Sequence, residues 1–131
     1  MRWAPRGAAA FFGIFALFQV ALALGAPFGE AAWGGAGGAV LPANLRWASA
    51  GAAGYLMLAI LVMLARSGDI GRPWMHWSIW MLNFLLTLQL TFNTVANFMS
   101  PSPPERWIMG PACAVGCLLC GVSLLAPRRV R

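Results

Sequence analysis

Residues 47–65 read WASAGAAGYLMLAILVMLA, an apolar run with no charged side chain that is bounded by Arg46 and Arg66. About 20 apolar residues in a helix cross the hydrocarbon core of a bilayer, because each residue adds about 1.5 Å to the length of the helix. Lipid offers no hydrogen-bond partner for the backbone, and a helix satisfies its own. This stretch therefore predicts a membrane-spanning helix.

Three further apolar runs of similar length accompany it, at residues 7–25, 77–99 and 107–126. The run at 7–25 follows Arg2 and Arg6 as a signal peptide would. It is longer than the apolar part of a typical signal peptide and lacks a well-placed cleavage pattern, so we interpret it as a helix. Only 9% of the chain is charged, against about a quarter in soluble domains. The sequence predicts an all-α, membrane-embedded antiparallel four-helix bundle in one domain, residues 1–131.

Arginine is distributed unequally between the two sides that this topology defines. One side carries Arg2, Arg6, Arg66, Arg72, Arg128, Arg129 and Arg131, whereas the other carries Arg46 and Arg106. Because arginine accumulates on the cytoplasmic side of membrane proteins, this bias predicts a cell-membrane protein with both termini in the cytoplasm. The net charge of +6 fits contact with anionic lipid headgroups. The arginines form no continuous basic stripe, so nucleic acid is not an expected partner.

The first connection on the outer side, residues 26–46, is the longest in the predicted bundle. It contains the tract GGAGG at residues 34–38, and glycine adopts positive φ angles that other residues avoid. The loop is either a flexible link or a folded cap whose turns need such angles. The second outer connection, SPSPPE at 100–105, is short and rich in proline.

The third apolar run carries most of the polar side chains of the predicted spans. At about 100° per residue, one arc of this helix holds Asn83, Thr87, Thr91, Asn93, Thr94 and Asn97, with Gln89 at its edge. Polar side chains inside a bilayer face protein or water. We therefore expect this arc to point into the bundle.

The topology brings polar groups from several segments to the outer half of the bundle. The candidate ligand-binding residues are Gln19, Gln89, Asn93, Asn97, Glu30, Arg46, Glu105 and Arg106. They would form an outward-facing polar pocket for a small solute, lipid or ion. The alternative is that the amides only hold the helices together, since interhelical hydrogen bonds are common and contribute about 0.6 kcal/mol each. Ion pairs of Glu30 or Glu105 with Arg46 or Arg106 would then anchor the loops.

Three cysteines, Cys113, Cys117 and Cys120, follow the pattern C-x₃-C-x₂-C and share one helix face. Thiolates would suit copper(I) or zinc. A neutral thiol is also a small apolar group, and no second cysteine cluster or nearby histidine completes a site. We therefore expect no metal. We also expect no cofactor, since haem with two histidine ligands is excluded by the single histidine, His76.

Catalysis has little support, because the serines within or beside the apolar runs have no histidine or lysine base at a matching depth. Small residues four positions apart recur instead, as in Ala50 and Gly54 or Ala112 and Gly116. Such pairs permit close approach of helices within one bundle or between subunits.

The two outer connections also carry a resemblance. The stretches GAPFGEAAWGG (25–35), LPANLRWAS (41–49) and NFMSPSPPERWIMGP (97–111) resemble a group of small bacterial integral membrane proteins with four apolar runs. The resemblance covers most of the chain. It implies the same four-helix topology, draws attention to the outer face and brings no known activity.

The sequence favours a non-enzymatic role. The leading prediction is an interaction or accessory subunit of a membrane complex, because a small bundle has little interior and exposes Phe, Leu and Trp as a docking face. Its partners would be the lipid bilayer and either other membrane subunits or further copies of itself. The alternative is binding or translocation of a small solute, lipid or ion through the polar cluster.

Overall fold

A computed structural model describes residues 2–71 and 73–126 as an all-helical bundle, which confirms the predicted fold class. The long helices are α1 (Trp3–Ala23), α2 (Ala43–Ser67), α3 (His76–Met99) and α4 (Gly110–Leu125). Short helical segments are η1 (Gly29–Ala31), η2 (Trp33–Gly35), η3 (Pro73–Met75) and the π-helical turn η4 (Glu105–Met109), which leads into α4. α1 and α2 begin about one turn earlier than predicted, because an apolar run marks only the part of a helix inside hydrocarbon.

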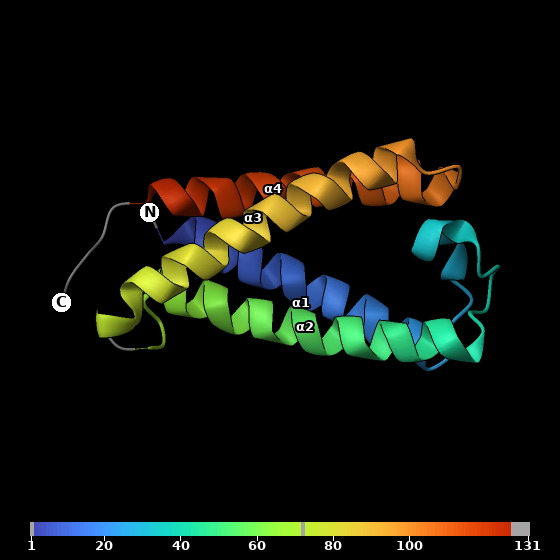
Figure 1. Ribbon diagram of the computed structural model, residues 1–131, viewed down its shortest axis with the longest axis horizontal. Coiled ribbons are helices and arrows are strands. Elements are labelled where there is room, and N and C mark those ends of the chain that lie inside the picture. Colours follow the sequence, from blue (N-terminus) through green and yellow to red (C-terminus); the bar gives the residue numbers. More distant parts are fainter. Residues whose placement is uncertain (1, 72, 127–131) are drawn as a thin grey trace.

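The helices form two antiparallel hairpins, α1 with α2 and α3 with α4 (Figure 1). The helices within each hairpin pack together closely, whereas α2 and α3 contact each other much less. The hairpins meet where α1 begins and α4 ends, which we call the terminal end, and diverge towards the opposite end (Figure 1). A cap made by residues 26–42 lies at that opposite end, which we call the cap end.

All four helices are long and apolar enough to cross a membrane, with α4 counted together with η4. Exposed tryptophans lie at both ends of the bundle. Trp3, Trp74 and Trp77 lie near the terminal end, and Trp47 and Trp107 near the cap end. Tryptophan collects at the two membrane–water interfaces. The bundle therefore fits a multi-pass membrane protein.

The apolar core fills the terminal half of the bundle. Its centre includes Phe12 of α1, Met63 of α2, Leu86 of α3 and Cys120 of α4. Gly116 of α4 lies against the Phe11 ring of α1, and a Cβ atom at position 116 would lie only 2.5 Å from that ring. The close approach predicted for small residues is therefore found at Gly116. At Gly54 no atom lies within 4 Å of the Cβ position.

Polar contacts join three helices and the α2–α3 turn at the terminal end. Arg6 of α1 forms an ion pair of 2.6 Å with Asp69, and Arg66 Nη2 of α2 donates to the carbonyl oxygen of Ala126 at 2.9 Å. The hydrogen bond from Arg6, together with one from the Ser67 hydroxyl, holds the pKa of the Asp69 carboxyl well below its usual range. These contacts fix where α1, α2 and the turn meet.

The cap is a folded element, which decides between the two interpretations of the glycine-rich loop. Gly34, Gly35 and Gly38 have φ angles of 72°, 70° and 70°, and Trp33 has a φ angle of 56°. A Cβ atom at Gly29 would lie 2.4 Å from the carbonyl oxygen of Gly38. Glycine is therefore required both for turns with positive φ and for close backbone packing.

Candidate binding pocket

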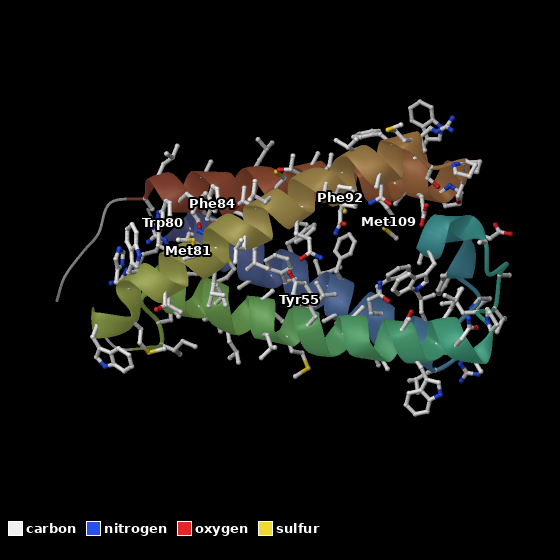
Figure 2. All side chains as sticks on the ribbon, in the orientation of Figure 1. Tyr55, Trp80, Met81, Phe84, Phe92 and Met109 are labelled. Atoms are coloured by element: carbon white, nitrogen blue, oxygen red, sulfur yellow. The ribbon has the colours of Figure 1, made fainter. Side chains whose placement is uncertain are left out.

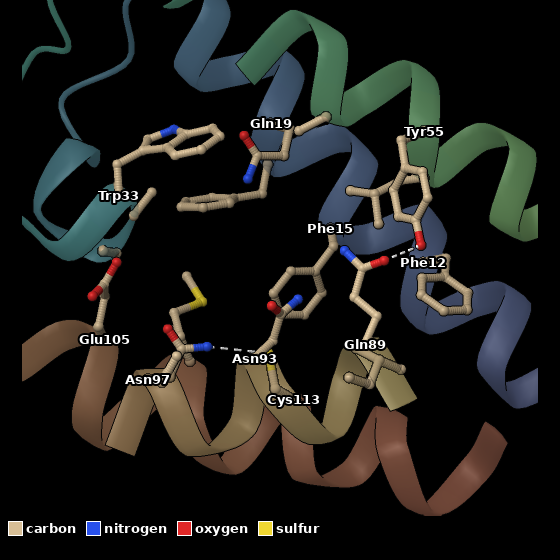
Figure 3. Close-up of a pocket in the computed structure, with 18 of the residues that line it drawn as sticks. Phe12, Phe15, Gln19, Trp33, Tyr55, Gln89, Asn93, Asn97, Glu105 and Cys113 are labelled. Atoms are coloured by element: carbon tan, nitrogen blue, oxygen red, sulfur yellow. Dashed lines mark hydrogen bonds between the residues drawn. The ribbon is translucent and has the colours of Figure 1, made fainter. Parts of the chain in front are cut away.

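A cavity of about 310 Å³ lies between the two hairpins in the cap half of the bundle (Figure 3). α1 and α2 form one wall, and α3 with the first part of α4 forms the other. Cap residues 31–33 cover the end of the cavity, and Phe12 and Leu90 separate it from the apolar core at the other end. The cavity exists because α2 and α3 diverge instead of packing along their length.

The lining includes polar residues that the sequence analysis selected. Gln19 of α1 and Gln89, Asn93 and Asn97 of α3 line the cavity, and so does Glu105 from η4 (Figure 3). The polar arc of α3 and Gln19, which lies in the cap half of α1, therefore meet around one cavity, as the topology predicted. Whether they bind a ligand stays a prediction.

The amides differ in how their hydrogen-bonding groups are used. Tyr55 Oη of α2 donates to Gln89 Oε1 of α3 at 2.5 Å across the cavity (Figure 3). Asn97 Nδ2 donates to Cys113 Sγ at 3.3 Å. Gln19 Oε1 is buried and has no hydrogen-bond partner among the described residues. A buried polar atom normally has a partner, so Gln19 presents an acceptor that a bound molecule could satisfy.

Glu105 ties the cap to the α3–α4 hairpin. Its side chain is only 5% exposed. Its Oε1 accepts a hydrogen bond from the backbone N–H of Gly34 at 2.8 Å, and its Oε2 accepts one from the hydroxyl of Ser100 at 2.5 Å. Both carboxylate oxygens are thus engaged, which makes Glu105 an anchor at the cap end of the cavity.

The predicted ion pairs at the cap end do not form. Between residues 2 and 126, Arg72 aside, the one ion pair is that of Arg6 with Asp69. Arg46 Nε instead donates to the carbonyl oxygen of Ala23 at the end of α1 at 2.9 Å, because α2 begins at Ala43 and brings Arg46 beside that helix end. The last carbonyl groups of a helix lack partners within the helix and attract cations.

The other two charged candidates also lie away from the cavity. Arg106 donates through Nη2 to the carbonyl oxygen of Ser100 at 2.7 Å and through Nε at 3.1 Å. The side chain of Glu30 is exposed in η1, and only its backbone oxygen takes part in the cap, as the acceptor of a hydrogen bond from Ser102. Arg46, Arg106 and Glu30 are therefore not among the cavity-lining residues.

Aromatic side chains form much of the cavity wall, and the sequence analysis missed them. Phe12, Phe15 and Phe18 come from α1, Tyr55 from α2 and Trp33 from the cap. A signal was present, since the phenylalanines recur at helical spacing and the only tyrosine lies in the middle of an apolar run. The Trp33 indole N–H donates to Ser49 Oγ of α2 at 3.0 Å, which holds its ring over the cavity.

The remaining polar groups of α3 mostly serve packing. Asn83 is fully buried and donates to the Ser123 hydroxyl of α4. The hydroxyls of Thr87, Thr91 and Thr94 each donate to the backbone oxygen four residues earlier. Among these polar residues of α3, Gln89, Asn93 and Asn97 therefore line the cavity, Asn83 joins α3 to α4, and the threonines bond to their own helix.

The cysteines lie where α4 packs against its neighbours. Cys113 lines the cavity, the Cys117 sulfur lies 3.2 Å from Thr91 Oγ1, and Cys120 is in the apolar core. All three are free thiols. Within the described part of the chain, no group of three His, Cys, Asp or Glu side chains is placed to hold a metal ion.

Comparison of the chain with known protein families, with curated proteins and with solved structures finds no match. The expected kinship with small four-helix bacterial membrane proteins therefore stays a prediction.

Proposed function

We propose that this protein binds a small, uncharged, amphiphilic molecule in the cavity beneath the cap. The observation that carries the proposal is the combination of amide groups and aromatic rings around one cavity. Ligand sites are typically cavities of about 300–1,000 Å³ with mostly apolar walls and a few convergent polar groups. A volume of about 310 Å³ falls at the lower end of that range.

The charge of the lining argues for an uncharged ligand. No arginine or lysine is among the described lining residues, and both oxygens of the one acidic side chain, Glu105, accept hydrogen bonds at the cap. An anion in the cavity would lose its hydration without gaining a partner of opposite charge, and the one carboxylate that a cation could meet is already held by two hydrogen bonds. Amides both donate and accept hydrogen bonds, so they suit hydroxyl and carbonyl groups.

We favour ligand binding over the predicted role as an accessory subunit, because the cavity is particular to this protein whereas an exposed apolar surface is not. Exposed apolar side chains occur on all four helices, and lipid covers such faces in any membrane protein. The predicted cytoplasmic position of the terminal end remains part of the proposal, and it places the cap and the pocket on the outer side of the membrane.

Mass spectrometry of small molecules that copurify with the protein in mild detergent tests the proposal. Asn93→Leu and Gln19→Leu remove amides from the cavity. Thr94→Val is the matched control, because Thr94 lies beside Asn93, is not among the lining residues and donates its hydroxyl to the backbone oxygen of Leu90. We expect an uncharged amphiphile with the wild-type protein and with Thr94→Val. Its amount should fall about tenfold in the leucine variants, which corresponds to about 1.4 kcal/mol. Equal retention by all variants, or no retained molecule, would contradict the proposal.

A further inference from the structure

Within the four long helices, the exposed part of the cavity lining belongs to α2 and α3. Tyr55 of α2 is 40% exposed, and Gln89 and Ala96 of α3 are exposed as well; in the cap, Trp33 is 41% exposed. Every lining residue of α1 and α4 is buried or half-buried. We therefore place the mouth of the cavity between α2 and α3, the neighbouring helices of the two hairpins that carry these exposed residues.

The cap closes the end of the cavity that would otherwise face water. It is bonded to α2 through Trp33 and Ser49, to η4 through Gly34 and Glu105, and to the α3–α4 turn through Ser102 and the Glu30 backbone oxygen. A Cβ atom at Gly35 would lie 2.8 Å from Ser102 Cβ, so cap and turn are in close contact. These contacts hold the cap over that end of the cavity.

The mouth lies at the depth of the hydrocarbon. Tyr55 is at the middle of α2, which runs from Ala43 to Ser67, and Gln89 is near the middle of α3, which runs from His76 to Met99. Figure 2 shows Tyr55 in the space between these helices. The middle of a spanning helix lies within the hydrocarbon core of about 30 Å, so the mouth opens towards lipid.

We propose that the ligand is a membrane lipid with an uncharged head bearing hydroxyl and carbonyl oxygens, and that it reaches the cavity sideways between α2 and α3. This inference rests on the binding function proposed above. The head would meet Gln19 and Asn93, and the hydrocarbon tail would stay in the bilayer. The Tyr55–Gln89 hydrogen bond crosses the mouth, so a lipid must displace it and thereby frees the Gln89 amide for its own head.

A photoreactive diacylglycerol with a diazirine beside its glycerol head, where one acyl chain begins, tests the inference in phosphatidylcholine nanodiscs that contain the full chain. Ala96→Trp places a large side chain at the mouth, whereas Val95→Trp places the same side chain on α3 outside the cavity lining. Because both positions are exposed, neither substitution disturbs the core, and thermal unfolding checks this. Ala52→Phe narrows the mouth from the α2 side, with the exposed residue Ala50 as the control position for Phe.

We expect the label on cavity-lining residues of α2 and α3, reduced about tenfold by Ala96→Trp and by Ala52→Phe but less than about twofold by the control variants. Unlabelled dioleoylglycerol should compete, and dioleoylphosphatidylglycerol, which is anionic, should not. Equal labelling of mouth and control variants, equal competition by the anionic lipid, or no label in the cavity would overturn the inference. If a water-soluble molecule nevertheless copurifies through the amides, the proposed function stands and only the lipid assignment fails.

Discussion

Replacing Glu105 with alanine should loosen the cap while the four long helices stay folded. The substitution removes the acceptor for the Gly34 N–H and the acceptor for the Ser100 hydroxyl. A hydrogen bond to a charged group contributes about 1.5–3 kcal/mol, and only the bond from Gly34 joins the cap, because Ser100 follows α3. The cap keeps its bond from Trp33 to Ser49, so we expect a loss near the lower limit, about 1.5 kcal/mol.

Hydrogen–deuterium exchange of the cap in lipid nanodiscs measures this loss directly. A decrease of about 1.5 kcal/mol in the free energy of local opening corresponds to exchange about tenfold faster at the Gly34 amide. Glu105→Gln should give a smaller increase, because its amide oxygen still accepts one hydrogen bond. Exchange in the core around Met63 serves as the internal control. Unchanged exchange at Gly34 in the alanine variant would refute the assignment of Glu105 as the cap anchor.

Two further substitutions test the packing and the electrostatics. Gly116→Ala should lower the stability in detergent by about 1–3 kcal/mol, because its Cβ atom would lie 2.5 Å from the Phe11 ring. Gly54→Ala, the control, should be neutral or stabilising. Equal thermal unfolding temperatures for the two variants would contradict the close contact between Gly116 and Phe11. Because the pKa of Asp69 is lowered in the folded protein, its ion pair should stabilise the fold fully above about pH 4, and this contribution should be lost as the pH falls further towards the folded-state pKa. Asp69→Asn should remove this pH dependence in thermal unfolding measured from pH 2 to 7. If the Asn variant still loses stability at low pH, another titrating group is responsible for the loss.

The sequence was sufficient to predict the helices because length and apolarity together determine a membrane span. The runs around 47–65 and 77–99 lie within α2 and α3. The polar face of α3 was predictable for a related reason, since the helical period places Asn93 and Asn97 on one arc and lipid excludes them from the outer surface. These inferences use only local spacing.

The roles of the charged residues could not be predicted in the same way. Which partner Arg46 takes depends on where α2 begins and on which helix ends beside it, and both are tertiary facts. Glu105 was correctly placed near the cavity, but its bond to Gly34 depends on the positive φ of the cap backbone. The two hairpins diverge and so create the cavity. This divergence depends on packing between helices that are far apart in the sequence, which local spacing does not predict.

A nitroxide spin label at position 93 offers the most direct measurement of the cavity itself. The label would be attached to the Asn93→Cys variant in nanodiscs, with Cys113, Cys117 and Cys120 replaced by alanine. The rates at which the label collides with oxygen and with a water-soluble nickel chelate would then be compared. A cavity that opens to lipid and is closed by the cap predicts frequent collisions with oxygen, which dissolves in hydrocarbon, and few with nickel. Glu105→Ala should raise the nickel collisions alone. Ready access of nickel to the label with Glu105 intact, or access of neither reagent, would contradict a cavity that lies beneath the cap and opens between α2 and α3.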